Sequence, residues 1–414
     1  MQTIQAEQNM IRLCLILATM WMLSLSTVSA QSSDNPARVF VEGSGFSQNW
    51  LGRSELQLKL SRGVPFRVFT LDAPRRLVID FKDLIWDDVH KKDLLPESRH
   101  IADLRFGAFQ PGWSRLIVDL NKALLPRDIS MVVDAQTGQA SLSLSLSSAS
   151  GQEFAQGSGA PKSAGWPVAR QDTQLTSFAP DQFVVVLDPG HGGVDPGAER
   201  EGVSEKVLML EMAKMLRTSL QQTGQVEVVL TRDSDVFVSL QSRVAQAHQV
   251  QADLFVSLHA DALSQGGAEG ATVYVLSDEA SDTASAHLAA RHNRADIISG
   301  ADLTGSDDQI TSVLLDMARR ETEPRTDALA RSFIRHMNAA GGPMNRHPLR
   351  RAGFSVLKSA DIPSVLIEVG FLSSRRDLKN LRNPAWRDGI VAAMTDAILD
   401  WRAQDAGKKA LIRQ

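Results

Sequence analysis

The side chains of His191, Glu205 and His259 are of the types that bind zinc in hydrolytic enzymes. Such sites commonly use three protein ligands from His and Glu and leave a fourth position open for water. Neither gap along the chain is the i, i+4 spacing of the helical His-Glu-x-x-His motif, so spacing alone leaves the metal assignment open. Other histidines in the same half of the chain compete for the role: His248, His287, His292, His336 and His347.

The elements around these side chains favour their convergence. Residues 184–187 are four consecutive apolar β-formers, which suits a strand covered on both faces in a parallel sheet. Open α/β sheets bind ligands beyond the carboxyl ends of such strands. His191 follows this strand, Glu205 opens a predicted helix that runs to about residue 224, and His259 ends a strand predicted at 253–258. We therefore expect both imidazoles at one rim of the sheet.

The rest of the C-terminal half continues the alternation of strands and helices. We expect further strands at 226–230, 272–276 and 363–369, and helices at 239–250 and 384–401. This order predicts a three-layer α/β domain with a mostly parallel sheet at 181–403, followed by a short tail at 404–414.

The N-terminal half, residues 37–148, offers only short β-rich runs separated by turn residues. Residues 56–60 and 141–146 alternate strictly between apolar and polar side chains, as strands with one buried face do. These features predict an all-β sandwich. Its histidines, His90 and His100, are isolated and fit no ligand pattern, so we expect no chemistry there.

The first 30 residues have the pattern of a secretory signal peptide: Arg12, an apolar stretch at 13–25, and Val28-Ser29-Ala30 at the cleavage position. The alternative is an uncleaved anchor, but the stretch is shorter than the roughly 20 residues that span a bilayer. The only cysteine, Cys14, lies in this segment, so the mature protein is expected to have no disulfide and no stable membrane span.

Residues 149–180 are rich in Ser, Gly, Ala, Gln and Pro, which predicts a flexible linker between the two domains. The formal net charge is −4, and Lys and Arg form no long run. Nucleic-acid binding usually requires clustered basic residues, so no nucleic acid is expected as a partner.

Four motifs of the C-terminal domain resemble, in order, those of the zinc-dependent N-acetylmuramoyl-L-alanine amidases of the Amidase_3 family. They lie at residues 186–198, 205–206, 256–262 and 363–372. The resemblance implies one Zn²⁺ per chain, with His191, Glu205 and His259 as its ligands and Glu368 as the catalytic glutamate. One departure is Ser374, where the family usually has Asn.

Residues 64–72, 74–81 and 101–120 resemble the AMIN domain, and the similarity covers roughly residues 38–146. In that family the domain holds periplasmic enzymes on peptidoglycan and at division sites. The resemblance implies a monomer in the periplasm of a Gram-negative cell, enriched at the division septum. The alternative is a module that serves only folding or solubility.

The implied reaction cleaves the amide between N-acetylmuramic acid and the L-alanine of the stem peptide. Zinc lowers the pKa of bound water and polarises the carbonyl, while Glu368 acts as base on the water and as acid toward the leaving amine. The alternative for Glu368 is a buried carboxylate paired with a backbone amide or with an arginine, such as Arg350 or Arg351. Asp188 and Asp261 neighbour the ligands and are predicted to orient them as hydrogen-bond acceptors.

Residues 277–323 are too long for an ordinary α/β connection of about 2–6 residues and are predicted to be an insertion with helical content. Through residues 293–300 they resemble the insertion that division-linked amidases of this family lay across the zinc, and that a LytM-domain activator displaces. His292 is the first candidate for a blocking ligand, and the others are Glu279, Asp282 and His287. The alternative is a surface excursion without function.

Two other functions stay open from the sequence. A zinc peptidase that cuts within the stem peptide would use a related His/Glu/His site. A wall-binding scaffold would have lost activity, but all four matched site residues are present.

Overall fold

The computed structural model describes residues 35–48, 54–95, 100–134, 136–159, 178–179, 182–263, 268–294 and 311–412. The predicted signal peptide with Cys14, and most of the predicted linker, lie outside these ranges. Among the described helices, none is both long enough and apolar enough to cross a membrane.

The N-terminal domain is a β-sandwich, in agreement with the sequence prediction. One sheet has the order β5-β1-β2-β9-β8 and the other β3-β4-β7-β6. The strands of the first sheet are β1 (Ala37–Gln48), β2 (Ser54–Leu60), β5 (Leu84–Ile85), β8 (Leu124–Val133) and β9 (Ala140–Ser148). Those of the second are β3 (Phe66–Leu71), β4 (Arg76–Lys82), β6 (Ile101–Gln110) and β7 (Trp113–Leu120), and a short helix α2 (Lys91–Leu94) follows β5.

The alternating strands bury the face that the sequence predicts. In β2, Leu56, Leu58 and Leu60 enter the core, and Leu58 pairs with Leu142 on β9. Strand β8 was not expected, because its side chains are mostly exposed and it contains Pro126. A proline that cannot donate a backbone hydrogen bond is tolerated here because β8 is an edge strand.

The beginning of the predicted linker is ordered instead as helix α3 (Gly151–Gly157). Ser150 and Glu153 form a capping box that satisfies two backbone N–H groups at its start. Phe154 is fully buried in the core of the sandwich. A single apolar side chain and its cap thus extend the N-terminal domain past residue 148.

The C-terminal domain contains a six-stranded sheet with the order β13-β10-β14-β17-β15-β16. Its strands are β10 (Val184–Pro189), β13 (Glu227–Leu230), β14 (Leu254–His259), β15 (Ala271–Leu276), β16 (Met344–Ala352) and β17 (Ser364–Glu368). Neighbouring strands run parallel except β15 and β17, which are antiparallel. The mostly parallel sheet is therefore confirmed, with one reversal in direction.

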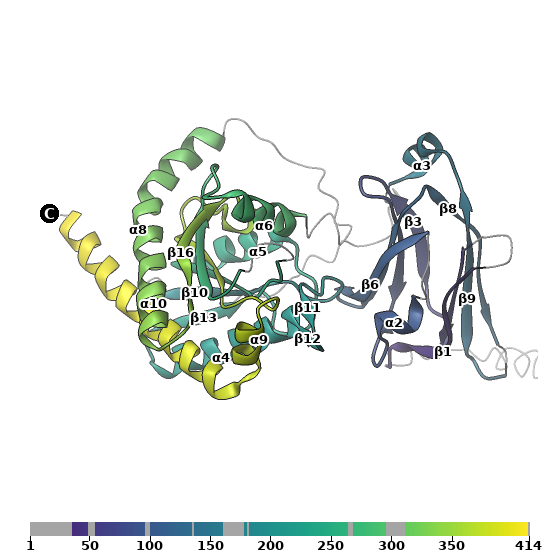
Figure 1. Cartoon of the computed structure of the whole chain (residues 1–414), viewed down its shortest axis with the longest axis horizontal. Coiled ribbons are helices and arrows are strands. Elements are labelled where there is room, and N and C mark those ends of the chain that lie inside the picture. Colours follow the sequence, from purple (N-terminus) through teal and green to yellow (C-terminus); the bar gives the residue numbers. More distant parts are fainter. Residues whose placement is uncertain are drawn as a thin grey trace, which may run out of the picture. The chain divides into compact units, whose positions relative to one another are not determined.

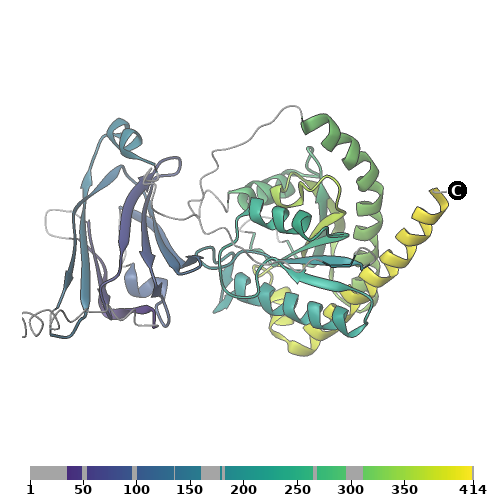
Figure 2. The same cartoon turned by 180° about the vertical axis from the view of Figure 1, so that it is seen from behind.

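Helices cover both faces of this sheet, which makes the predicted three layers (Figure 1). On one face lie α4 (Glu205–Gln222), α8 (Thr311–Ala339) and α10 (Pro384–Ile412), and α9 (Arg375–Arg382) adjoins them. On the other lie α5 (Leu240–Gln249), α6 (Thr283–Asn293) and the 3-10 turn η1 (Ser355–Leu357). The reverse view shows the long helices α8 in green and α10 in yellow (Figure 2). A hydrogen bond of 3.0 Å from Trp401 Nε1 on α10 to the carbonyl of Arg325 on α8 joins them.

Some elements of this domain differ from the sequence prediction. The end of the expected insertion, from Thr311, belongs to α8, which continues through Pro324 to Ala339. Edge strand β16 was missed because its sequence is largely basic, and α10 extends through the predicted tail to Ile412. A hairpin of β11 (Glu199–Arg200) and β12 (Val203–Ser204) leads into α4.

Candidate active site

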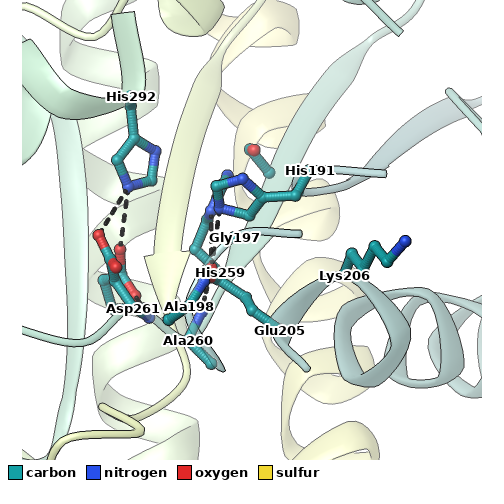
Figure 3. A network of polar contacts seen from close by, with 12 residues as sticks. His191, Gly197, Ala198, Glu205, Lys206, His259, Ala260, Asp261 and His292 are labelled. Carbon is teal, nitrogen blue, oxygen red and sulfur yellow. Dashed lines mark hydrogen bonds and ion pairs between the residues drawn. The ribbon is translucent and has the colours of Figure 1, made fainter. Parts of the chain in front are cut away.

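His191, Glu205 and His259 lie together at the carboxyl ends of β10 and β14, as expected. Glu205 Oε1 lies 3.2 Å from His191 Nε2 and 3.1 Å from His259 Nδ1. Figure 3 shows the two imidazoles beside the carboxylate. The three side chains form a group whose ligand atoms lie close enough to share one metal ion.

A fourth residue, Asp195, orients His191. Its Oδ2 lies 2.9 Å from His191 Nδ1, which leaves Nε2 directed at Glu205. Although burial acts in the opposite direction, the Asp195 and Glu205 carboxylates raise the pKa of His191 to about 10 in the metal-free protein. A metal bound at Nε2 must therefore displace a proton. The sequence analysis does not predict this role for Asp195. Its position four residues after His191 is the one feature that could have indicated it.

Glu205 is fully buried at the first position of α4. Backbone N–H groups hold both of its oxygens: Ala198 donates to Oε2 at 2.8 Å and Ala260 donates to Oε1 at 2.9 Å. Burial opposes ionisation, but His191 and His259 hold the pKa of Glu205 well below its ordinary value. This carboxylate is thus ionised and fixed in the orientation that a metal ligand needs.

Two glycines allow the backbone to pass close to these side chains. A Cβ added at Gly190 would lie 2.3 Å from the His259 ring, and one at Gly197 would lie 2.6 Å from the His191 ring. Any larger residue would displace an imidazole. Steric hindrance from the histidine rings therefore explains why glycine occupies positions 190 and 197.

Glu368 ends β17 and pairs in register with His259 on β14, which brings it to the same rim. It is fully buried, and the Asp261 N–H donates to its Oε2 at 2.9 Å. Burial, with the nearby Glu205 carboxylate, raises the pKa of Glu368 well above its ordinary value. Such a carboxyl accepts a proton more readily than one in water.

Of the structural alternatives for Glu368, pairing with Arg350 or Arg351 is wrong, whereas pairing with a backbone amide is present at Asp261. Arg350 instead pairs with Asp282, and Arg351 pairs with Glu323 and Asp327. Glu368 Oε1 is buried without a hydrogen-bond partner among the described residues. An unpartnered buried carboxylate oxygen is costly and favours a functional role.

The unsatisfied atoms also fit a metal ion. Besides Glu368 Oε1, the buried His191 Nε2 lacks a hydrogen-bond partner within the described chain. Both ring nitrogen and carboxylate oxygen are donors that Zn²⁺ accepts. A cavity of about 20 Å³ borders His191, His259 and His292, and this volume suffices for one water molecule.

His292, on the last turn of α6, points into this site from the opposite side (Figure 3). Its Nε2 lies 3.2 Å from Asp261 Oδ2 and 3.8 Å from Glu368 Oε1, and its ring centroid is 4.3 Å from that of His259. His259, His292 and Glu368 form a second group that can hold a metal. Of the blocking candidates, the structure brings His292 to the site.

The other blocking candidates lie elsewhere. Glu279 and His287 are exposed, and Asp282 caps the start of α6 by accepting from the Ser285 N–H at 2.7 Å. None of these three residues belongs to either group of described residues that could hold a metal ion.

The predicted roles of Asp188 and Asp261 need correction, since neither contacts an imidazole of the candidate metal group His191, Glu205 and His259. Asp188 binds Arg243 at 2.5 Å and accepts from the hydroxyls of Thr231 and Ser257. Asp261 contacts His292 and forms an ion pair with Arg291, both on α6. The sequence places both carboxylates near the ligands but does not give the direction of their side chains.

The remaining histidines are engaged away from this rim or exposed. His248 lies 3.1 Å from Ser359 Oγ, His336 Nδ1 lies 2.9 Å from the carbonyl of Ser332, and His347 is exposed. Ser374, the departure from the family pattern, caps α9 by accepting from the Asp377 N–H at 3.3 Å. Its role in this structure is to start a helix.

Comparison with known proteins agrees with this geometry. Residues 185–400 match the family model Amidase_3, described as N-acetylmuramoyl-L-alanine amidase, and residues 48–142 match the AMIN domain. The amidase AmiC of Escherichia coli is 28% identical over 405 residues, which cover 94% of each chain. AmiC of Neisseria meningitidis is 29% identical over 83% of this chain and 86% of its own.

A third relative matches only the C-terminal domain. AmiA of Escherichia coli is 37% identical over 220 residues, which cover 53% of this chain and 75% of its own. The family match contains all four residues of the site, His191, Glu205, His259 and Glu368. The chain therefore belongs to the Amidase_3 family of N-acetylmuramoyl-L-alanine amidases, hydrolases of an amide bond, and it carries an AMIN domain before its amidase domain.

Proposed function

We propose that this protein is a zinc-dependent amidase that removes stem peptides from peptidoglycan during cell-wall remodelling and daughter-cell separation. The observation that carries the proposal is the convergence of His191, Glu205 and His259 beside the unpartnered Oε1 of Glu368. The residues fit one Zn²⁺ with an open position for water and substrate. Amidase activity on peptidoglycan accords with the named activity of the AmiC and AmiA relatives.

The residues of the site divide the chemical work. When bound, zinc supplies a Lewis acid that polarises the scissile carbonyl and acidifies water. Glu368 would accept a proton from the attacking water through Oε1 as the new C–O bond forms, and would then deliver that proton to the nitrogen of the leaving L-alanine as the C–N bond breaks. The Asp261 N–H fixes Oε2 of Glu368 at 2.9 Å, while Oε1 has no hydrogen-bond partner among the described residues and lies 3.8 Å from His292 Nε2.

The products of wall digestion test this function against a zinc peptidase. Purified, zinc-loaded protein should release intact stem peptides and leave glycan without peptides, as measured by mass spectrometry. Shortened peptides still attached to glycan would show cleavage within the stem peptide instead. No release at all with zinc bound, either by the parent or by a variant in which a Gly/Ser linker replaces residues 279–320, would support a non-catalytic scaffold.

We further propose that the N-terminal β-sandwich binds peptidoglycan and directs the enzyme to the septum. The signal peptide at 1–30 would deliver it to the periplasm, and the linker would let the two domains act independently. A segment of residues 31–159 should pellet with insoluble peptidoglycan without cutting it. It includes α3 because Phe154 completes the core of the sandwich.

The matched control is the segment 181–414. Both segments are mixed with purified wall, and bound and free protein are separated by centrifugation. If residues 31–159 stay in the supernatant while residues 181–414 pellet, the wall-binding role belongs to the amidase domain.

We also propose that α6, within the insertion 277–323, restrains the enzyme until an activator with a LytM domain binds. His292 and Arg291 both engage Asp261, so the helix end is anchored beside Glu368. Arg291 Nη1 also donates to the carbonyl of Ala262 at 2.9 Å. A helix held here by several charged contacts occupies space that the stem peptide needs.

His292→Ala is therefore expected to raise the rate of wall digestion by about 5–150-fold, the range that a coupling free energy of about 1–3 kcal/mol produces. His287→Ala is the matched control, because His287 is exposed on the same helix. Dye release from labelled wall measures the rate. A His292→Ala protein that keeps its zinc and is no faster than the parent would show that α6 is not an inhibitor.

A second variant tests the insertion as a whole. Replacing residues 279–320 with a short Gly/Ser linker should activate the enzyme at least as much as His292→Ala. If the shortened protein folds, keeps zinc and digests wall at the parent's rate, the insertion has another purpose.

A further inference from the structure

The loop that carries His191 is held by two buried arginines. The carbonyls of Pro189, Gly190 and His191 are consecutive along the chain, and each accepts a hydrogen bond from a guanidinium. Arg232 donates to Pro189 through Nε at 3.0 Å and to Gly190 through Nη2 at 2.8 Å. Arg243 donates to Pro189 through Nη1 at 2.9 Å and to His191 through Nη2 at 2.8 Å.

This loop has an uncommon backbone conformation. His191 has a φ of 59°, in the left-handed region that non-glycine residues rarely adopt, and Gly192 and Gly193 follow with φ of 131° and 58°. Such a conformation costs about 1–3 kcal/mol and persists only when the surroundings enforce it. The two guanidinium groups supply that enforcement at the residue whose ring must face Glu205.

Both arginines are themselves fixed. Arg243 forms a buried ion pair with Asp188, which also accepts from Thr231 Oγ1 at 2.6 Å and Ser257 Oγ at 2.7 Å. Arg232 Nη2 also donates to the carbonyl of Lys206 at 2.7 Å, one residue after Glu205. Arg232 thus connects the His191 loop to the start of the helix that carries Glu205.

The arrangement is costly in electrostatic terms. Arg232 and Arg243 are each only 3% exposed and lie near one another. Burial and the neighbouring Arg243 lower the pKa of Arg232 to about 10. Like charges brought together in the protein interior destabilise the fold, and here the Asp188 carboxylate and the hydrogen bonds to the loop carbonyls offset that cost. The guanidinium fork, with several donors in one plane, can hold adjacent carbonyls in a way that lysine cannot.

We propose that Arg232 and Arg243, with Asp188 behind Arg243, are positioning residues that fix the left-handed His191 loop and so preset the zinc site. This inference rests on the proposed zinc dependence. It explains why Asp188, which contacts no zinc-ligand imidazole, lies buried at the end of β10. Loss of the arginine contacts would let His191 relax out of the geometry in which its Nε2 faces Glu205.

The test measures zinc affinity and metal geometry in the full mature protein. Arg243→Met removes the Nη1 and Nη2 donors to the loop carbonyls, and Arg243→Lys keeps the positive charge. Asp188→Asn removes the carboxylate charge that pairs with Arg243. Arg325→Met is the matched control, because Arg325 forms an ion pair with Asp405 on α10, away from the rim. The zinc dissociation constant comes from competition with a chelator, and the visible spectrum of the cobalt-loaded protein reports the geometry.

Arg243→Met is expected to weaken zinc binding by about 10–100-fold, as the loss of outer contacts to metal ligands typically does. It should also change the cobalt spectrum, and Arg243→Lys should restore part of the affinity. Arg325→Met should lower the melting temperature without either effect. If Arg243→Met does not fold, the zinc affinity and the cobalt spectrum of Asp188→Asn and Arg243→Lys test the positioning role instead.

Two outcomes separate this inference from the proposed function. If the parent binds zinc and the folded variants lose thermal stability but keep the parent's zinc affinity within about twofold and its cobalt spectrum, the arginines serve the fold alone and the positioning role is wrong. If the parent itself binds no zinc, the proposed metal dependence fails, and this inference fails with it.

Discussion

Glu368→Gln is expected to lower kcat for wall digestion by about 10²–10⁴-fold, the usual contribution of a positioned general acid–base group, while zinc content stays unchanged. The amide can still accept the Asp261 N–H through its oxygen, so the shape of the site is preserved. What is lost is the proton acceptor at Oε1, which has no hydrogen-bond partner among the described residues. Without it, neither the attacking water nor the leaving amine exchanges a proton efficiently.

The experiment compares Glu368→Gln with Glu211→Gln, an exposed glutamate on α4 whose side chain is 54% accessible. Rates are measured on purified peptidoglycan and metal content by elemental analysis. Substantial activity in the zinc-loaded Glu368→Gln protein would show that another group activates the water. Loss of zinc in this variant would instead make Glu368 a ligand.

Replacing His191, Glu205 or His259 with Ala should weaken zinc binding by about a hundredfold and abolish activity at limiting zinc. Binding free energies of about 10–16 kcal/mol for four-ligand zinc sites amount to about 3 kcal/mol per ligand. We expect the largest loss of zinc affinity in the Glu205 variant, because this carboxylate contacts both imidazoles and supplies the only negative charge of this ligand group. Its removal also leaves two backbone N–H groups without their acceptor.

The zinc dissociation constant of each variant is measured by chelator competition, with His248→Ala as the control. His248 is half-exposed and bonds to Ser359, outside the site. Parent-like affinity in all three ligand variants would place the metal elsewhere, and parent-like affinity in His191→Ala and Glu205→Ala but not in His259→Ala would place it on the second group of His259, His292 and Glu368.

The sequence was sufficient to predict which strands end at the active-site rim. Residues 184–187 are a continuous apolar run, and residues 254–258 are apolar except for Ser257; only a strand covered on both faces buries such a run completely. Because parallel strands share a carboxyl edge, His191 and His259 had to lie near one another. The convergence of Glu205 with them followed from its place at the start of the next helix.

The contacts behind the ligands were not predictable in the same way. Asp195 reaches His191 only because the loop between them turns through positive φ at His191, Gly192 and Gly193. The partner of Asp188 is Arg243, 55 residues away on another element. Side-chain direction in such a loop depends on tertiary contacts that no local pattern contains.

Edge strands escaped prediction for a different reason. Strand β16 is mostly polar and β8 mostly exposed, so neither shows the apolar alternation of a strand with a buried face. Each is held by backbone pairing to a single neighbour. Hydrogen bonds to a neighbouring strand demand no particular side chain, and they leave little trace in the sequence.

The reversed strand β15 bears on how this enzyme can evolve. Because Thr272 pairs with Glu368 and Tyr274 with Leu366, β15 begins at the active-site rim and ends at the opposite end of the sheet. The chain therefore enters α6 far from the metal ligands, and the 11 residues of α6, about 16 Å of helix, carry it back toward them. Insertions or deletions near residues 277–282 would change the reach of this helix without altering the strands that hold the catalytic residues. Under the proposed restraint by α6, such changes would alter the control of the enzyme while the residues of the site stay in place.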